Sequence, residues 1–107
     1  MTRTVIVRYR VRPERTAENE ALVRAVYEQL HDEQPDGLRY ATFVDADGAG
    51  FTHLAFSEAG PGNPALTDLS AFTRFQEGLG ERCEEPPVLT ELREVGSYRF
   101  HANEPAP

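Results

Sequence analysis

The sequence predicts an α+β domain of the ferredoxin-like type, with the element order βαββαβ. Three observations predict it: two amphipathic helical stretches alternate with β-rich runs, a hairpin lies between the two helices, and all connections are short. A length of 107 residues suits one domain. We place that domain at residues 1–100 and expect residues 101–107, which contain two prolines, to form a flexible tail.

The first strand is predicted at about residues 4–12, because apolar and polar residues alternate there. The face that we expect to pack on the helices consists of Val5, Val7, Tyr9 and Val11. Arg8 and Arg10 project to the other face. Pro13 ends the strand, since proline cannot donate a ladder hydrogen bond. A helix is expected over residues 16–33, with Thr16 as its N-cap and an apolar stripe on one side.

The hairpin is the most informative part of the chain. Strands are predicted at residues 38–45 and 51–57, on either side of the turn-forming sequence DADGAG at residues 45–50. A four-residue loop that places Asp45 opposite Gly50 also places Thr42 opposite His53. We expect these two side chains to lie on the sheet face that the helices leave uncovered.

The same register places Tyr40 opposite Ala55, and the predicted pocket is therefore lined by His53, Thr42, Tyr40 and Ala55. A slip of one residue would replace Tyr40 and Thr42 by Ala41 and Phe43. Register decides which set lines the pocket, because side chains alternate between the two faces of a strand.

The second helix is predicted to begin at Asn63-Pro64 or near Asp68 and to end at Pro86-Pro87. Its apolar face contains Leu69, Phe72, Phe75, Leu79 and Cys83. A last strand follows at about residues 88–95. With both helices on one face of the sheet, the other face needs a cover, and a second copy of the chain is the commonest one. We therefore expect a homodimer.

Composition excludes several classes of function. The net charge of −7 argues against nucleic acid or an anionic membrane as a partner. No run of 18 apolar residues is present to span a membrane, and the apolar stretch at the N-terminus is too short for a signal peptide. Cys83 is the only cysteine, which precludes an internal disulfide and agrees with the cytoplasm. All 11 basic residues are arginines, so no lysine nucleophile exists.

Five segments together resemble the dimeric α/β-barrel superfamily, in particular its antibiotic-biosynthesis-monooxygenase-like branch. They are VRYRVRPE (7–14), GLRYATFVD (37–45), FTHLAFSE (51–58), AFTRFQEGL (71–79) and PPVLTELREVGSY (86–98). The resemblance covers about residues 4–100 and depends on the order of the elements. It implies two ferredoxin-like subunits whose open sheet faces enclose a barrel. It also implies one of several activities, which include cofactor-free oxygenation of aromatic polyketides, haem degradation, isomerisation and lactonisation.

The chain departs from the active members of that branch in its pocket residues. Polyketide monooxygenases and haem-degrading relatives use tryptophan and asparagine, whereas this sequence has no tryptophan and its first strand has no asparagine. No catalytic residue is therefore carried over. The resemblance implies a small monooxygenase-like enzyme without bound metal or cofactor, acting on a hydrophobic or aromatic molecule. The alternative is a non-catalytic ligand-binding or structural homodimer.

Within this hypothesis His53 handles a proton, as general base or hydrogen-bond donor, and a haem-ligand role is a further possibility. The alternative is a histidine held by hydrogen bonds in the core. Tyr40, Phe43 and Phe72 shape the pocket. Arg8 or Arg10 orients an anionic oxygen; otherwise these arginines pair with Glu91 or Glu94.

Cys83 is expected to be buried and inert, because its neighbours Glu81, Glu84 and Glu85 disfavour a thiolate. The three histidines lie on different predicted elements, and no metal-binding spacing is present. The sequence therefore predicts no metal site.

Overall fold

The structure, a computed structural model, describes residues 3–57 and 64–100. The elements in chain order are β1 (Arg3–Val11), the 3-10 turn η1 (Pro13–Arg15), α1 (Thr16–Glu33), β2 (Leu38–Val44), β3 (Gly50–Ser57), α2 (Pro64–Thr67), α3 (Ser70–Gln76), α4 (Leu79–Arg82) and β4 (Cys83–Leu92). The predicted tail at 101–107 lies outside the described residues, as does Asn63.

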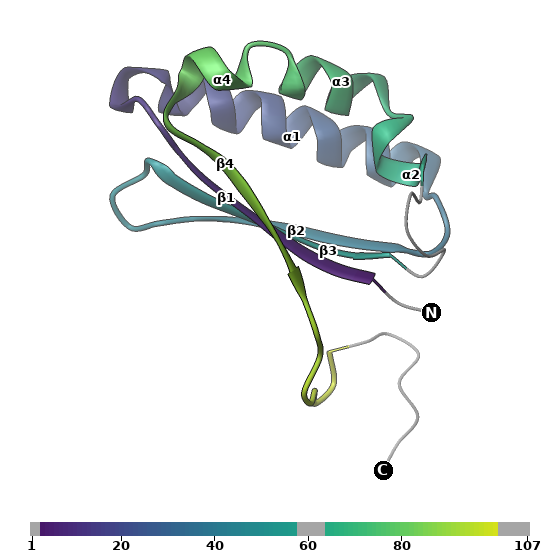
Figure 1. The fold of residues 1–107 in the computed structure, drawn as a ribbon. Coiled ribbons are helices and arrows are strands. Elements are labelled where there is room, and N and C mark those ends of the chain that lie inside the picture. Colours follow the sequence, from purple (N-terminus) through teal and green to yellow (C-terminus); the bar gives the residue numbers. More distant parts are fainter. Residues whose placement is uncertain (1–2, 58–63, 101–107) are drawn as a thin grey trace.

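One antiparallel sheet of four strands carries the fold, in the order β2-β3-β1-β4. All helices lie on one face of this sheet, with α1 and α3 side by side above it (Figure 1). The predicted ferredoxin-like fold is confirmed. The hairpin has the expected register as well, because Thr42 pairs with His53 and Tyr40 with Ala55.

The core lies between the sheet and the helices. Its centre consists of the buried residues Tyr9, Val11, Val23, Val26, Phe51, Leu69, Ala71, Phe75 and Cys83. The predicted apolar face of the first strand supplies two of them, Tyr9 and Val11, and that of α1 supplies Val23 and Val26. Burial of each Val, Leu or Phe side chain stabilises the fold by roughly 1.5–3 kcal/mol, so this layer holds the sheet and helices together.

The first helix starts in a different way from the expected one. Pro13 ends β1 as predicted, but it also opens the 3-10 turn, which leads straight into α1. Thr16 is thus the first residue of α1, and Arg15 occupies the cap position without a side-chain cap hydrogen bond. The prediction of Thr16 as N-cap was wrong, because the preceding 3-10 turn already supplies helical backbone.

The predicted second helix is three short helices. The first begins at Pro64, one of the two expected starts, and the second at Ser70. Gly78, with φ of +74°, separates α3 from α4, since a left-handed residue interrupts the helical backbone. Cys83 is buried as predicted, but it lies in β4 and not on a helix.

Two prolines inside a strand explain the other boundary error. Pro86 and Pro87 were expected to end a helix, yet both lie within β4. This strand is at the edge of the sheet, and the pairing with β1 shifts in register between Arg8 and Val11. An edge position and a bulge are the two places where a strand tolerates proline. Residues 88–92 of the predicted strand are therefore the second half of a longer strand, whereas the predicted residues 93–95 lie beyond its end at Leu92.

The sheet face opposite the helices has an apolar centre, and no helix or strand of the described residues covers it. Its side chains include Ile6, Leu54 and Phe56 at the centre, with Phe43 and Val88 more than half exposed. Phe100 lies edge-on against Phe56, with ring centroids 5.2 Å apart. In Figure 1 no element covers this face, and β4 extends beyond the rest of the sheet. This is the surface that the sequence expects a second subunit to cover.

Candidate functional site

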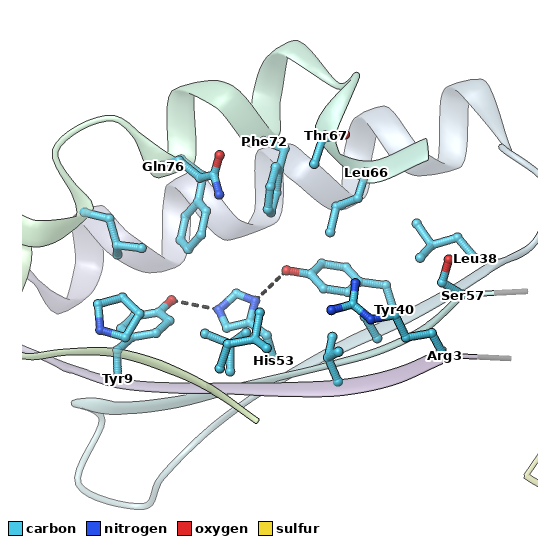
Figure 2. A pocket seen from close by; sticks show the side chains of 17 residues that line it. Arg3, Tyr9, Leu38, Tyr40, His53, Ser57, Leu66, Thr67, Phe72 and Gln76 are labelled. Carbon is cyan, nitrogen blue, oxygen red and sulfur yellow. Dashed lines mark hydrogen bonds between the residues drawn. The ribbon is translucent and has the colours of Figure 1, made fainter. Parts of the chain in front are cut away.

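A cavity of about 540 Å³ lies between the sheet and the helices. The strands contribute Val5, Val7, Tyr9, Leu38, Tyr40, His53, Ala55, Pro87 and Leu89, and the helices contribute Leu66, Phe72, Phe75, Gln76 and Leu79. Arg3, Ser57 and Thr67 complete the lining. The volume falls within the range of small-molecule sites, and most of the wall is apolar. Figure 2 shows Phe72 and Leu66 pointing from the helices toward a row of rings on the sheet.

His53 faces the helices and not the open side of the sheet. It pairs with Val7, whose face packs on the core, and its ring centroid is 5.4 Å from that of Phe75 on α3. The prediction that His53, Thr42 and Tyr40 occupy the uncovered face was therefore wrong. The predicted register was right. The error was in the choice of which alternate residues of β3 face the helices. Leu54 and Phe56, which alternate with His53 along β3, lie on the open face.

Both ring nitrogens of His53 take part in hydrogen bonds. Nε2 is 2.7 Å from the hydroxyl of Tyr9, and Nδ1 is 2.6 Å from the hydroxyl of Tyr40 (Figure 2). Thr42 Oγ1 lies 3.1 Å from Nδ1 and 2.7 Å from the hydroxyl of Tyr27 on α1. With neither nitrogen free, the geometry does not support His53 as a haem ligand. It supports His53 as a hydrogen-bonded polar group in the otherwise apolar wall of the cavity.

The hydrogen-bonded chain continues into the core beyond Tyr9. The amide of Asn19 donates through Nδ2 to the Tyr9 hydroxyl at 3.0 Å, and Arg82 donates through Nε to Asn19 Oδ1 at 3.1 Å. Asn19 is 0 % exposed and Arg82 2 %. The guanidinium also donates to the carbonyl oxygens of Phe75 and Glu77, and it lies over the Phe75 ring. A buried cation is thus held by neutral acceptors and a π face.

Burial determines the protonation of these groups. Loss of hydration lowers the pKa of His53 from 6.5 to about 4, so the imidazole is neutral at neutral pH. Burial raises the pKa of Tyr9 and of Tyr40 above the usual tyrosine value, so both phenols keep their hydrogens. Burial likewise raises the pKa of the Cys83 thiol, which agrees with an unreactive side chain.

The structure brings together some of the predicted site residues and separates others. Tyr40, His53 and Phe72 line the cavity, and Thr42 lies behind His53. Phe43 is 59 % exposed on the opposite sheet face and does not reach the cavity. Its assignment to the pocket was wrong.

Arg8 and Arg10 also lie away from the cavity, on the open face as their parity predicted, so neither can orient a ligand there. Arg10 forms an ion pair with Asp47 in the hairpin loop. The expected strand partner Glu91 pairs with Arg3 instead, at 3.5 Å. The predicted pairing of Arg8 or Arg10 with this carboxylate was wrong, because Glu91 faces the helix side with Val5.

Sequence reasoning missed Asn19 and Arg82 altogether. Both carried a signal in their spacing, since Asn19 precedes Val23 and Val26 on the buried stripe of α1. Arg82 follows Phe75 by seven positions and Leu79 by three, which places it on the apolar side of the helical stretch. A polar residue at a core position of a helix is a sign of a buried hydrogen-bond network.

Two further structural findings concern other classes of site. Among the described residues, no group of three or more His, Cys, Asp and Glu side chains could hold a metal ion. In the same part of the chain, no helix has the length and apolarity needed to cross a membrane.

The fold is similar to that of several solved structures. A protein from Mycobacterium tuberculosis superimposes with a TM-score of 0.73 at 21% identity, covering 91% of this chain and 98% of its own. A Nitrosomonas europaea protein with a provisional designation as an antibiotic biosynthesis monooxygenase gives 0.72 at 17% identity, with 88% and 90% covered. A protein titled as an antibiotic biosynthesis monooxygenase gives 0.67 at 25% identity, with 90% and 100% covered. No family model and no curated protein matches the sequence.

These likenesses define the class of the fold. The chain has the ferredoxin-like α+β fold that it shares with structures designated as antibiotic biosynthesis monooxygenases, as the sequence resemblance predicted. The similarity extends over nearly the whole of each chain, so no large insertion or deletion distinguishes this protein from the three structures described above. This similarity concerns the fold. Any chemistry depends on the side chains that line the cavity.

Proposed function

We propose that this protein is a monooxygenase-like enzyme that binds a hydrophobic or aromatic small molecule in the cavity between sheet and helices. A single observation supports this most strongly: an apolar cavity of about 540 Å³ contains one hydrogen-bonded polar centre, His53 with Tyr9 and Tyr40. Apolar walls with a few placed polar groups are typical of ligand sites. The fold neighbours with monooxygenase designations support the same reaction class.

The reaction would suit an activated CH₂ group, such as the one between the two rings of an anthrone. The CH₂ becomes a carbonyl, one oxygen atom of O₂ enters the product, and the other leaves as water with both hydrogens of the CH₂. The substrate itself supplies the electrons, so the reaction needs no external reductant. In this proposal the Tyr40–His53 pair orients the substrate oxygen and takes part in moving its proton, while the apolar walls exclude water.

A non-catalytic ligand-binding or structural homodimer is the second candidate, and one observation favours it. Both nitrogens of His53 are engaged in hydrogen bonds, and burial lowers its pKa to about 4. A base with so low a pKa is poorly matched to proton abstraction at neutral pH. Catalytic turnover of a bound molecule therefore distinguishes the enzyme from the non-catalytic homodimer.

The test uses a cavity-filling variant. Ala55 lines the cavity with a methyl group, so Ala55→Trp places an indole in the space proposed for the ligand. The matched control is Ala17→Trp on the exposed side of α1. We expect wild type and Ala17→Trp to consume oxygen with an anthrone probe, with ¹⁸O from ¹⁸O₂ in the product, and Ala55→Trp to be inactive. Binding of the anthrone without oxygen uptake would favour the second candidate, and no binding would overturn both ligand hypotheses.

We also propose that the protein is a cytoplasmic homodimer that buries the open sheet face. The support is the apolar character of this face, with Ile6, Leu54 and Phe56 at its centre and Val88 at its edge. Contiguous exposed apolar surface of this kind is typical of an interface. The fold class also pairs sheets in this way, as the resemblance implies.

Light scattering on an aspartate pair of variants tests the interface. Leu54→Asp introduces a charge at the centre of the open face, whereas Ala21→Asp introduces the same charge on the exposed side of α1. We expect a dimer mass for wild type and Ala21→Asp at micromolar concentration, and a monomer mass for Leu54→Asp. A monomeric wild type would refute the proposal.

A further inference from the structure

We propose that buried Arg82 fixes the direction of the hydrogen bonds from Asn19 through Tyr9 to His53, so that Tyr40 offers its phenol hydrogen to the ligand. The cavity then selects an apolar molecule that presents a hydrogen-bond acceptor oxygen, such as an aromatic ketone. The ligand half of this inference rests on the proposed function. The direction of the hydrogen bonds does not.

The direction begins at Arg82, because a guanidinium donates hydrogen bonds and never accepts them. Its Nε lies 3.1 Å from the side chain of Asn19, so the atom facing it must be the acceptor Oδ1. The amide cannot be flipped, since Nδ2 would then meet another donor. Nδ2 is therefore directed to the hydroxyl of Tyr9, 3.0 Å away.

Tyr9 passes the same direction on to His53. The hydroxyl accepts from Asn19, and its own hydrogen needs an acceptor, because Tyr9 is only 5 % exposed. His53 Nε2, at 2.7 Å, is the partner that the structure provides. Nε2 must then be the unprotonated nitrogen, and the neutral imidazole carries its hydrogen on Nδ1.

His53 in this tautomer donates from Nδ1 toward the nearer oxygen, the Tyr40 hydroxyl at 2.6 Å, rather than Thr42 Oγ1 at 3.1 Å. The Tyr40 oxygen thus accepts a hydrogen bond from His53 Nδ1. The Tyr40 hydroxyl hydrogen is not used in that bond and can rotate about the C–O bond toward another acceptor. Without a ligand this hydrogen can turn to Thr42. With a ligand in the cavity that Tyr40 lines, it can turn to an acceptor oxygen.

The consequence for ligand class follows from satisfying that hydrogen. An aromatic ketone accepts it, whereas a hydrocarbon of the same shape leaves it with the weaker internal partner. Burial keeps both Tyr9 and Tyr40 protonated, so each has a hydrogen to donate. Asn19 and Arg82 touch no ligand in this scheme and are positioning residues.

The first experiment reads the tautomer directly, in protein labelled with ¹⁵N-histidine. A long-range ¹H–¹⁵N correlation spectrum distinguishes protonated from unprotonated ring nitrogens. The chain has three histidines, and a His53→Gln variant assigns the relevant signals. We expect a protonated Nδ1 and an unprotonated Nε2 for His53. The opposite pattern would overturn the proposal, whether or not the protein is an enzyme.

The nearly isosteric substitution Asn19→Asp is expected to reverse the direction of the hydrogen bonds between Tyr9, His53 and Tyr40. The carboxylate accepts from Arg82 with one oxygen and from Tyr9 with the other, so Tyr9 no longer donates to His53. His53 is then expected to carry its hydrogen on Nε2 and to accept from Tyr40 at Nδ1. Gln34→Glu, exposed at the end of α1, is the control for adding one negative charge. An unchanged tautomer in Asn19→Asp would contradict the inference.

Ligand preference is measured with the matched probes fluorenone and fluorene, which differ in one carbonyl. We expect wild type and Gln34→Glu to bind fluorenone about fivefold more tightly than fluorene, the ratio that one net hydrogen bond gives. Asn19→Asp and Tyr40→Phe should lose this preference, because the variant sites no longer offer a hydrogen to the carbonyl of fluorenone. Tyr98→Phe, which removes an exposed phenol, should retain it.

The nitrogen spectrum and the ligand affinities test the two halves of the inference separately. Equal affinities of the two probes for wild type would overturn the ligand half of the inference. If neither probe binds, the proposed function fails together with that half, and the nitrogen spectrum still decides the direction of the chain. A preference that survives in Asn19→Asp despite an altered tautomer would also refute the link between Arg82 and the ligand.

Discussion

Burial of His53 predicts that acid destabilises this protein. The folded-state pKa is about 4, whereas the ordinary value is 6.5, because burial removes the hydration of the imidazolium. The contacting groups Tyr9, Tyr40 and Phe75 are uncharged and do not replace that hydration. Between the two pKa values the unfolded chain binds a proton that the folded chain does not bind. Lowering the pH through this window therefore favours unfolding.

The magnitude follows from the two pKa values. Above pH 6.5 the contribution of His53 to stability is fully present, and it is lost as the pH falls toward 4. Between pH 8 and pH 5 the expected loss is about 2 kcal/mol. It approaches a limit of about 3 kcal/mol at lower pH, since each unit of pKa difference corresponds to about 1.4 kcal/mol.

Urea denaturation at pH 8 and at pH 5 measures this loss, and His53→Gln is the control because glutamine keeps hydrogen-bonding capacity but does not titrate. The carboxyl groups of Glu18 and Asp47, whose pKa values are lowered, also lose stabilising interactions in acid. They are present in both proteins, so their effect cancels in the difference. Protein concentration is held constant, since a dimer makes stability depend on it. Equal losses for wild type and His53→Gln would refute the account.

Two further predictions concern the framework around the site. Leu69→Ala removes a side chain that is 2 % exposed in the core, and it should lower the free energy of unfolding by about 3 kcal/mol in urea denaturation; a loss below about 1 kcal/mol would mean that the site collapses around the smaller side chain. Gly48→Ala forces an L-residue into φ of +81° in the hairpin loop and should cost about 1 kcal/mol by the same assay. An unchanged midpoint would show that the loop adopts another turn.

Register was predictable from the sequence, whereas the buried face of the hairpin was not. The loop of residues 45–50 fixed the pairing of Thr42 with His53, because the backbone amide of Asp45 donates to the carbonyl of Gly50 as expected. The face depends on which parity of β3 packs beneath the helices. Leu54 and Phe56 are more apolar than His53, so a rule of apolar burial selects the wrong set. Both faces of this sheet carry large apolar side chains in the hairpin, so the hairpin alone does not distinguish them.

The first strand contained the information that the hairpin lacked. Val5, Val7, Tyr9 and Val11 form its apolar face, and in the ferredoxin-like order β1 is the direct neighbour of β3. Val7 pairs with His53, so the face of one strand determines the face of the other. The breaks in the second helix were less predictable. A glycine such as Gly78 is common just after a helix end but is also tolerated inside a helix at a cost of about 1 kcal/mol, so tertiary packing decides.

The surroundings of Arg82 allow one substitution to change stability and ligand preference in opposite directions. Its guanidinium is 2 % exposed, and its partners in the described residues are the neutral oxygens of Asn19, Phe75 and Glu77. A cation withdrawn from water is costly unless a counter-charge compensates it, so neutral acceptors are not the most stable solution. Asn19→Asp supplies the missing carboxylate and should raise stability, while it reverses the chain and removes the preference for a carbonyl ligand. If Asn19 served only to stabilise the core, a more stable variant would bind the two probes as wild type does. A gain in stability with a loss of preference is the result that only the directional chain predicts.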